Sequence, residues 1–398
     1  MNDLDALWAF LVAAVVAVLL TPQTARLAHR VGAVAHPRDR DLHDSPMPRL
    51  GGLAILAGVL LAGALFLPSG QETRGILGGA AAITLVGAID DARPGGLHPV
   101  VKLAGQFAAA LIPVVCEVRV ANITLPFVEP LDLGAWGFAL TLLGIVAVMN
   151  VVNFTDGVDG LAAGVCTIAA ATFAVIALSL DRVDAGILAA ATAGAAVGFL
   201  RHNFHPASVF MGDSGSNLLG LLLACIAIQG VLKTAAVVAL FFPLVILAVP
   251  AADATFVVAK RIKYRRPVYS ADRWHFHHRF ANIGFSQRRT VLYLYAWTIS
   301  LAALALALRF VPYSEDDGTF DLAWTLVIAA FGVAALAASV YLVLVLEILK
   351  FRRFRERQLR QEAATGERPA LSEAEIDREI EREVETGEFD AVVADEQP

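Results

Sequence analysis

The chain has 398 residues, of which 57% are hydrophobic and 17% are charged, and its mean hydropathy is +0.65. Soluble globular domains have roughly 45–50% apolar and about 25% charged residues, so this composition disfavours a soluble enzyme, a disordered chain and a nucleic-acid-binding domain. The formal net charge of −6, taken as a whole-chain average, argues against anionic partners, and three widely spaced cysteines exclude a disulfide framework or a zinc knuckle. The composition predicts a polytopic integral membrane protein.

Eleven charge-poor stretches are apolar enough to form the helix of about 20 residues that crosses a bilayer. The first is not a cleavable signal peptide, because Asp3 and Asp5 precede it where basic residues would stand. We therefore expect an all-α protein of about eleven transmembrane helices, with a short hairpin in 118–127 that carries no catalytic candidate. In chain order the stretches are 6–22, 51–67, 74–89, 99–115, 134–152, 160–180, 184–200, 214–231, 233–257, 290–311 and 322–349.

The distribution of lysine and arginine predicts the orientation, because basic residues collect in cytoplasmic loops. The loops after the odd-numbered stretches and the flank of the last stretch contain 23 of these residues, and the opposite loops contain five. The N-terminus is therefore expected outside and the C-terminus in the cytoplasm, in a multi-pass protein of the cell (inner or plasma) membrane.

The acidic residues are concentrated near the C-terminus. Residues 361–398 contain 13 acidic residues and three arginines, so the remainder, 1–360, has a net charge of +4. We expect a transmembrane catalytic domain at 1–350 and a charged cytoplasmic tail at 351–398, which is mobile or marginally helical because it has little apolar content. The basic excess of the remainder lies on the predicted cytoplasmic side, where anionic substrates would arrive.

Two adjacent aspartates, Asp90 and Asp91, end the third stretch, and Lys102 opens the fourth. Adjacent carboxylates repel each other and are costly near a bilayer, so a metal ion or a proton that offsets their charge favours them. The alternative is a solvated cap at the end of a span.

Residues 150–164, NVVNFTDGVDGLAAG, place Asn150, Asn153, Asp156 and Asp159 within ten positions. Hard oxygen ligands at this density suit Mg²⁺ or the polar edges of a nucleotide, and the intervening glycines allow close approach of a ligand. The alternative is an Asx-rich turn between two helices.

Residues 204–220 contain Asp213, which is followed by Ser-Gly-Ser and then by an apolar helix. This pattern is typical of a helix N-terminus whose free amide groups hold a phosphate. A plain N-cap, with Phe210 as a core residue, is the alternative.

Residues 270–289 carry Arg273, His275, His277 and His278 after a basic run at 260–266. Guanidinium groups beside imidazoles suit an anionic substrate such as a pyrophosphate. A zinc site is one alternative, but no fourth ligand or catalytic glutamate follows at zincin spacing. A headgroup-binding basic loop is the other, and it leaves the histidines unexplained.

All four motifs fall on the predicted cytoplasmic side. Carboxylates for a divalent cation, a phosphate cradle and an arginine–histidine cluster together indicate phosphoryl transfer. Two other classes stay open. A secondary transporter has repeated halves and polar groups near the midplane, and no convincing repeat is visible in this sequence. A membrane metalloprotease would hold zinc with His275, His277, His278 and Asp213.

The order of the motifs along the chain resembles that in the polyprenyl-phosphate N-acetylhexosamine-1-phosphate transferase family, and the resemblance covers nearly all of residues 1–350. HxHH preceded by Asp-Arg resembles the branch that uses UDP-GlcNAc, whereas the pentapeptide transferases carry three consecutive histidines and here Phe276 interrupts the run. The matching motifs are MPRLGG (47–52), IDD (89–91), KLAGQ (102–106), NxxNFxDGxDGLAAG (150–164), FMGDSGS (210–216), DRxHxHHRF (272–280) and GFSQRR (284–289).

The resemblance implies an eleven-helix membrane enzyme that transfers N-acetylglucosamine-1-phosphate from UDP-GlcNAc to undecaprenyl or decaprenyl phosphate, releases UMP and requires Mg²⁺, with Mn²⁺ as the substitute. This reaction would be the first membrane step of cell-wall or surface polysaccharide assembly. A phospho-MurNAc-pentapeptide transferase is the alternative within the family. An apolar lipid-facing surface allows a homodimer, and no nucleic acid partner is expected.

The same resemblance gives each motif residue an expected role. The catalytic residues would be Asp90, Asp91, Lys102 and Asp213: the first two would hold or deprotonate the lipid phosphate, Lys102 would contact phosphate, and Asp213 would ligate the metal together with Asn153. Family members often carry an acid or a lysine where this chain has Pro94. Substrate binding is expected from Asn150; from Asp156, Gly157 and Asp159, which would line the uridine pocket; from Phe210, which would stack on uracil; and from Arg273, His275, His277 and His278, which would engage the sugar and pyrophosphate.

Overall fold

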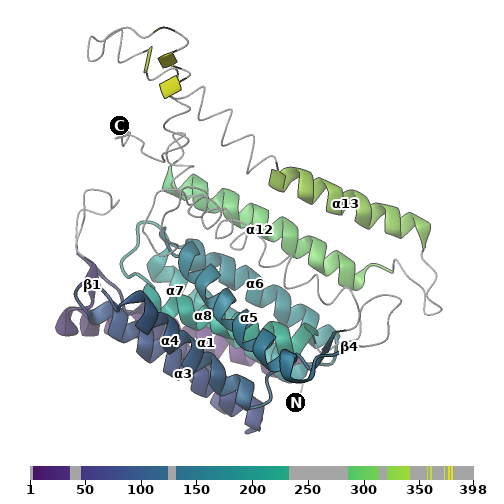
Figure 1. The fold of residues 1–398 in the computed structure, drawn as a ribbon, viewed down its shortest axis with the longest axis horizontal. Coiled ribbons are helices and arrows are strands. Elements are labelled where there is room, and N and C mark those ends of the chain that lie inside the picture. Colours follow the sequence, from purple (N-terminus) through teal and green to yellow (C-terminus); the bar gives the residue numbers. More distant parts are fainter. Residues whose placement is uncertain are drawn as a thin grey trace. The chain divides into compact units, whose positions relative to one another are not determined.

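The computed structural model is mostly helical (Figure 1) and describes residues 3–35, 46–123, 131–232, 286–312 and 321–340, with a few single positions beyond 355. The chain divides into two units. One consists of Met1–Ala252 with Leu294–Val311, and the other of Asp253–Tyr293 with Pro312–Pro398. Arg273, His275, His277 and His278 lie outside the described residues, as do the predicted span 233–257 and most of the C-terminal tail.

The described helices of the first unit follow the predicted spans closely. In chain order they are α1 (Asp3–Val31), α2 (Gly51–Phe66), α3 (Gln71–Ala92), α4 (Pro99–Val115), α5 (Gly134–Thr155), α6 (Leu161–Ser179), α7 (Val183–Asn203) and α8 (Gly212–Ala227), which continues into the π-helical turn η1 (Ile228–Leu232). Helix α12 (Gln287–Phe310) belongs mainly to this unit, and α13 (Leu322–Val340) belongs to the second.

Ten of the eleven predicted spans therefore coincide with described helices. Six of these helices are long and apolar enough to cross a membrane, and α2, α4 and part of α13 are shorter apolar helices. This helical, apolar character is that of a polytopic membrane protein. The count of eleven spans and the orientation stay predictions.

Two short strand pairs join the helices. Strand β1 (Val34–Ala35) pairs with β2 (Met47–Pro48), and β3 (Asn122–Ile123) pairs with β4 (Leu131–Asp132), both antiparallel. The second pair confirms a hairpin near the predicted position, but its partner strand lies beyond 118–127. The predicted range contains β3 but not β4. A strand of two residues is too short to show an alternating pattern in the sequence.

Small residues allow the helices of the first unit to pack closely. Helix α1 packs against α2 and α7, and α7 packs against α6. A Cβ added at Gly194 or Gly198 on α7 would meet the backbone carbonyl of Phe10 or Ala14 on α1. Small residues that let helix backbones approach are the usual basis of packing between membrane helices.

Helix α8 is the central helix of the first unit and packs against α2, α3, α5, α6 and α7 (Figure 1). Every residue of α8 except Asp213 is buried. Gly52 on α2 and Gly87 on α3 lie so close to its first turn that an added Cβ would meet the backbone of Ser214 or Gly215. The packing thus brings the ends of α2 and α3 directly against the helix start that carries Asp213.

Candidate active site

Asp213 is the centre of a polar cluster formed by the ends of four helices. Lys102 on α4 forms an ion pair with its Oδ2, and Asn153 Nδ2 on α5 donates to its Oδ1 at 2.7 Å and to Ser216 Oγ at 2.8 Å. Lys102 Nζ also lies 3.9 Å from Asp90 Oδ2 on α3. The structure therefore brings together three motifs that are spread over more than 100 positions of the sequence, from Asp90 to Asp213.

The two adjacent aspartates of α3 have different surroundings. Asp90 accepts a hydrogen bond from the backbone N–H of Leu97 and faces Lys102. Asp91 is only 6% exposed, and its two oxygens accept from the backbone N–H groups of Asp213 and Ser214, each at 3.0 Å. Asp91 thus caps the N-terminus of α8 from a neighbouring helix, where orphan amides and the helix dipole favour a carboxylate.

The loop between α5 and α6 is held against the segment that follows α7. Asp159 is buried and accepts hydrogen bonds from His205 Nδ1 and from the backbone N–H of Ala207, each at 3.0 Å. Gly160, at φ +78°, donates to Asn203 Oδ1 at 3.0 Å and accepts from the hydroxyl of Tyr295 on α12. These contacts fix the entry to α6.

Two further loop residues were expected to line a nucleotide pocket. Gly157 is exposed, and Asp156 is half-buried at the end of α5. Burial, together with the negative charges of Asp213 and Asp91, raises the pKa of Asp156 to about 8. The negative charges of the Asp213 cluster therefore act on Asp156.

A buried network of amide side chains lies behind the cluster. Gln106 Nε2 on α4 donates to Asn217 Oδ1 at 2.7 Å, and Asn150 Nδ2 donates to Gln106 Oε1 at 2.9 Å and to the Val146 carbonyl at 2.8 Å. Asn217 Nδ2 donates in turn to the carbonyl of Asp213 at 2.8 Å. The network joins α4, α5 and α8, and the structure places Asn150 within it.

Several residues of this arrangement were not singled out from the sequence. Gln106 and Asn217, each 1% exposed, could have been noticed as amides inside apolar stretches, because polar groups at membrane depth are costly unless they are paired. Asn203 and His205 gave no such signal, since both follow the predicted span 184–200 rather than lying inside it. Phe210, which was singled out, is half-buried and lies two residues before the start of α8.

The donor set at Asp213 fits a hard divalent cation. Among the described residues no three histidine, cysteine or acidic side chains form a metal-binding group. Mg²⁺, however, is usually held by one or two carboxylates with waters and substrate phosphates completing the shell. The carboxylate of Asp213 and the side-chain oxygen of the adjacent Asn153 are donors of this kind.

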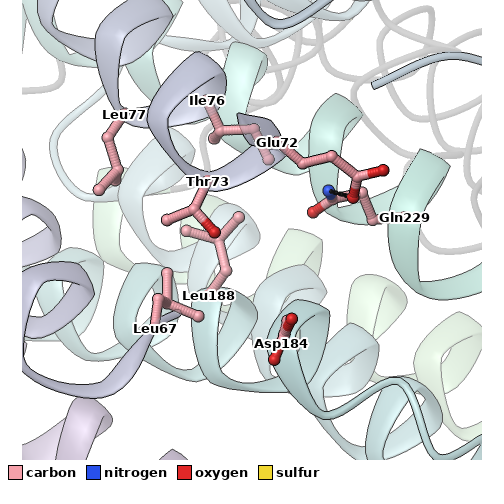
Figure 2. A pocket seen from close by; sticks show the side chains of 8 residues that line it. All are labelled: Leu67, Glu72, Thr73, Ile76, Leu77, Asp184, Leu188 and Gln229. Carbon is pink, nitrogen blue, oxygen red and sulfur yellow. Dashed lines mark hydrogen bonds between the residues drawn. The ribbon is translucent and has the colours of Figure 1, made fainter. Parts of the chain in front are cut away.

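The cavity in Figure 2 lies elsewhere. It is lined by the start of α3, by α7 and by η1, and Gln229 Nε2 donates to Glu72 Oε2 there at 2.5 Å. Glu72 and Asp90 are 18 residues apart on one continuous helix, which at 1.5 Å per residue is about 27 Å. The cavity is thus at the opposite end of α3 from the Asp213 cluster.

A polytopic helical protein with carboxylates, a lysine and amides gathered at one set of helix ends has the architecture of an integral membrane enzyme. The model of glycosyl transferase family 4 matches residues 73–231, which contain the whole Asp213 cluster. The chain belongs to this family, in its branch of polyprenyl-phosphate N-acetylglucosamine-1-phosphate transferases, and is a phosphotransferase.

Two relatives support the branch, and a third supports the family more broadly. The chain is 38% identical over 303 residues to a probable undecaprenyl-phosphate N-acetylglucosaminyl 1-phosphate transferase of Bacillus subtilis, a match that covers 75% of this chain and 84% of the relative. It is 37% identical over 324 residues to the decaprenyl-phosphate N-acetylglucosaminephosphotransferase of Mycobacterium leprae, covering 72% and 79%. It is also 36% identical over 330 residues to a phospho-N-acetylmuramoyl-pentapeptide-transferase of Desulforudis audaxviator, covering 74% and 96%.

Proposed function

We propose that this protein transfers N-acetylglucosamine-1-phosphate from UDP-GlcNAc to a polyprenyl phosphate and releases UMP, in a Mg²⁺-dependent reaction on the cytoplasmic face of the cell membrane. The observation that carries the proposal is the cluster of Asp213, Lys102, Asp90 and Asn153 at the ends of four apolar helices. A lipid phosphate, with its tail in the bilayer, presents its headgroup at such helix ends. The names of the relatives in Bacillus subtilis and Mycobacterium leprae support the acceptor class and the transferred sugar.

The reaction forms one bond and breaks one. An oxygen of the lipid phosphate attacks the β-phosphorus of UDP-GlcNAc, and the bond from that phosphorus to the bridging oxygen breaks, so that UMP leaves. Asp90 and Lys102 adjoin each other, so we assign them to holding the acceptor phosphate, with Asp90 available to take a proton from it. Asp213 and Asn153 would hold Mg²⁺, whose chemistry is to neutralise charge on phosphate oxygens.

A phospho-MurNAc-pentapeptide transferase is the second candidate. It is favoured by the match to the relative of Desulforudis audaxviator, which spans 96% of that protein. The two candidates share the acceptor class and the bond that breaks, and they differ in the sugar of the donor. Assaying both donors side by side therefore separates them.

The test is label transfer by the purified full-length chain in detergent. Radiolabelled UDP-GlcNAc and undecaprenyl phosphate are supplied with Mg²⁺, and the label that becomes extractable into butanol is counted. We expect transfer by the wild type and a loss of about 100-fold or more in Asp213→Asn, as for removal of a group that stabilises transition-state charge. Asp184→Asn, an exposed aspartate at the Figure 2 cavity, is the matched control and should retain activity.

Other results would reject the proposal or its metal assignment. Transfer from UDP-MurNAc-pentapeptide alone would establish the second candidate. Uptake of a solute by proteoliposomes without lipid product would indicate a transporter. Full activity in Asp213→Asn, or no loss on chelation of Mg²⁺, would remove the metal assignment.

A further inference from the structure

Arg49 stands beside the Asp213 cluster without an assigned role. The segment that carries it is hydrogen-bonded to the segment before α8: Phe210 N donates to the Pro48 carbonyl at 2.8 Å, and Gly52 N donates to the Met211 carbonyl at 3.1 Å. The carbonyl of Arg49 itself lies against Gly212. The backbone of Arg49 is therefore fixed next to the residue that precedes Asp213.

The side chain of Arg49 has hydrogen-bonding capacity that the described residues do not use. Its Nε is buried and forms no hydrogen bond within the described ranges. Within the described ranges, Thr290 is the one other residue whose side chain has a buried polar atom without a hydrogen bond. A buried donor without a partner costs free energy, so its persistence beside a functional site indicates a partner that is supplied by a ligand.

The ion pairs of the site also leave the positive charge of Arg49 available to an anion. Lys102 is engaged by Asp213 and Asp90. Arg49 acts electrostatically on Asp91 and Asp156 but, in the part of the chain that the structure describes, forms no ion pair with either. Of Lys102 and Arg49, Arg49 is thus the one that pairs with no carboxylate among the described residues.

We propose that Arg49 binds a phosphate group of a substrate, with its guanidinium fork on two non-bridging phosphate oxygens. Guanidinium matches phosphate in a bidentate geometry that an ammonium group cannot reproduce. This inference rests on the proposed function and adds a substrate-binding residue to it. Both the nucleotide sugar and the lipid acceptor offer such oxygens, and the experiment identifies which of them Arg49 binds.

Arg49→Gln and Arg49→Lys test the proposal in the purified full-length protein. Steady-state transfer is measured while UDP-GlcNAc and undecaprenyl phosphate are varied in turn. We expect Arg49→Gln to raise the KM of one substrate by about 10- to 100-fold, the loss typical of one charged hydrogen-bonding partner, with a smaller change in kcat. Arg49→Lys should recover part of the affinity. The substrate whose KM changes is the one that Arg49 binds.

Direct binding keeps the inference independent of the transferase assay. Affinities for UMP, and for undecaprenyl phosphate in detergent micelles, are measured by equilibrium dialysis and by tryptophan fluorescence. Arg201→Gln, an exposed arginine in the last turn of α7, is the matched control and should bind both probes like the wild type. A wild type that binds the probes but transfers no label would reject the proposed function. The affinities of Arg49→Gln for the same probes would still show whether Arg49 binds phosphate.

A purely structural role predicts a different pattern. If Arg49 only offsets the charge of Asp91 and Asp156, Arg49→Gln lowers the melting temperature while the folded fraction binds both probes normally. If Arg49→Gln fails to fold, Arg49→Lys carries the test, since it keeps the charge and loses the fork. Unchanged KM values and unchanged affinities in the folded variant would overturn the proposal.

Discussion

Asp90 and Asp91 are adjacent on α3, yet their carboxylates contact different partners. Successive residues of an α-helix point about 100° apart. Asp90 consequently faces Lys102, whereas Asp91 faces the first amides of α8. The sequence marks the pair as costly near a bilayer, but it does not separate the two residues, because the amides that hold Asp91 belong to residues more than 120 positions away.

Substitution of each aspartate by asparagine should separate a positioning role from a catalytic one. Asp91→Asn leaves one of two buried amides without an acceptor, which costs about 1–3 kcal/mol of stability. Asp90→Asn removes the charge beside Lys102 and should lower turnover by about 100-fold or more, as expected of a residue that handles a proton or a reacting phosphate, with little effect on unfolding.

Thermal unfolding in detergent and the label-transfer assay are run on both variants. The decisive comparison is the ratio of the two effects: a larger loss of melting temperature in Asp90→Asn than in Asp91→Asn would reverse the assignment.

At the scale of elements, the apolar pattern identifies the helices well and their ends poorly. Helix α5 continues to Thr155, past the predicted end at 152, and so includes Asn153. An apolar stretch marks only the residues that lie in the bilayer core. The helix continues beyond that stretch where its polar side chains have hydrogen-bonding partners. Asn153 finds them in Asp213 and Ser216. The polar ends of the helices are therefore the part that hydropathy does not predict.

The contact between α3 and α8 gives an element-scale prediction. Gly87→Ala places a Cβ against the backbone of Ser214, so the two helices must separate and Asp91 must release the α8 amides. We expect both lower stability and lower turnover. Gly78→Ala on the same helix is the control, because its Cβ meets only Ile112 Cγ2 at 3.6 Å.

Gly78→Ala should be neutral or stabilising, since alanine favours a helix interior over glycine by about 1 kcal/mol. Unfolding and label transfer are measured for the two variants together. Equal behaviour of Gly87→Ala and Gly78→Ala would show that the close approach of α3 and α8 is not needed to form the site.

At the scale of the whole molecule, the helix ends that carry the site agree with the charge pattern. Asp90 and Asn153 stand near the C-terminal ends of α3 and α5, and Lys102 and Asp213 near the starts of α4 and α8. In a chain that crosses the membrane with each helix, these ends share one face. That face also bears the excess of lysine and arginine, which predicts that it is cytoplasmic.

Cysteine labelling tests this orientation. In a Cys116→Ser background, Cys166 and Cys225 remain buried, so a new exposed cysteine is the reactive one among the described thiols. Ser69→Cys, between α2 and α3, should react with a membrane-impermeant maleimide in intact cells, whereas Arg93→Cys, directly after α3, should react only after permeabilisation. Both positions are exposed and flank the same helix, so each controls for the reactivity of the other. The reverse pattern would place Asp90 and Asp213 on the outer face and would contradict a reaction on the cytoplasmic face.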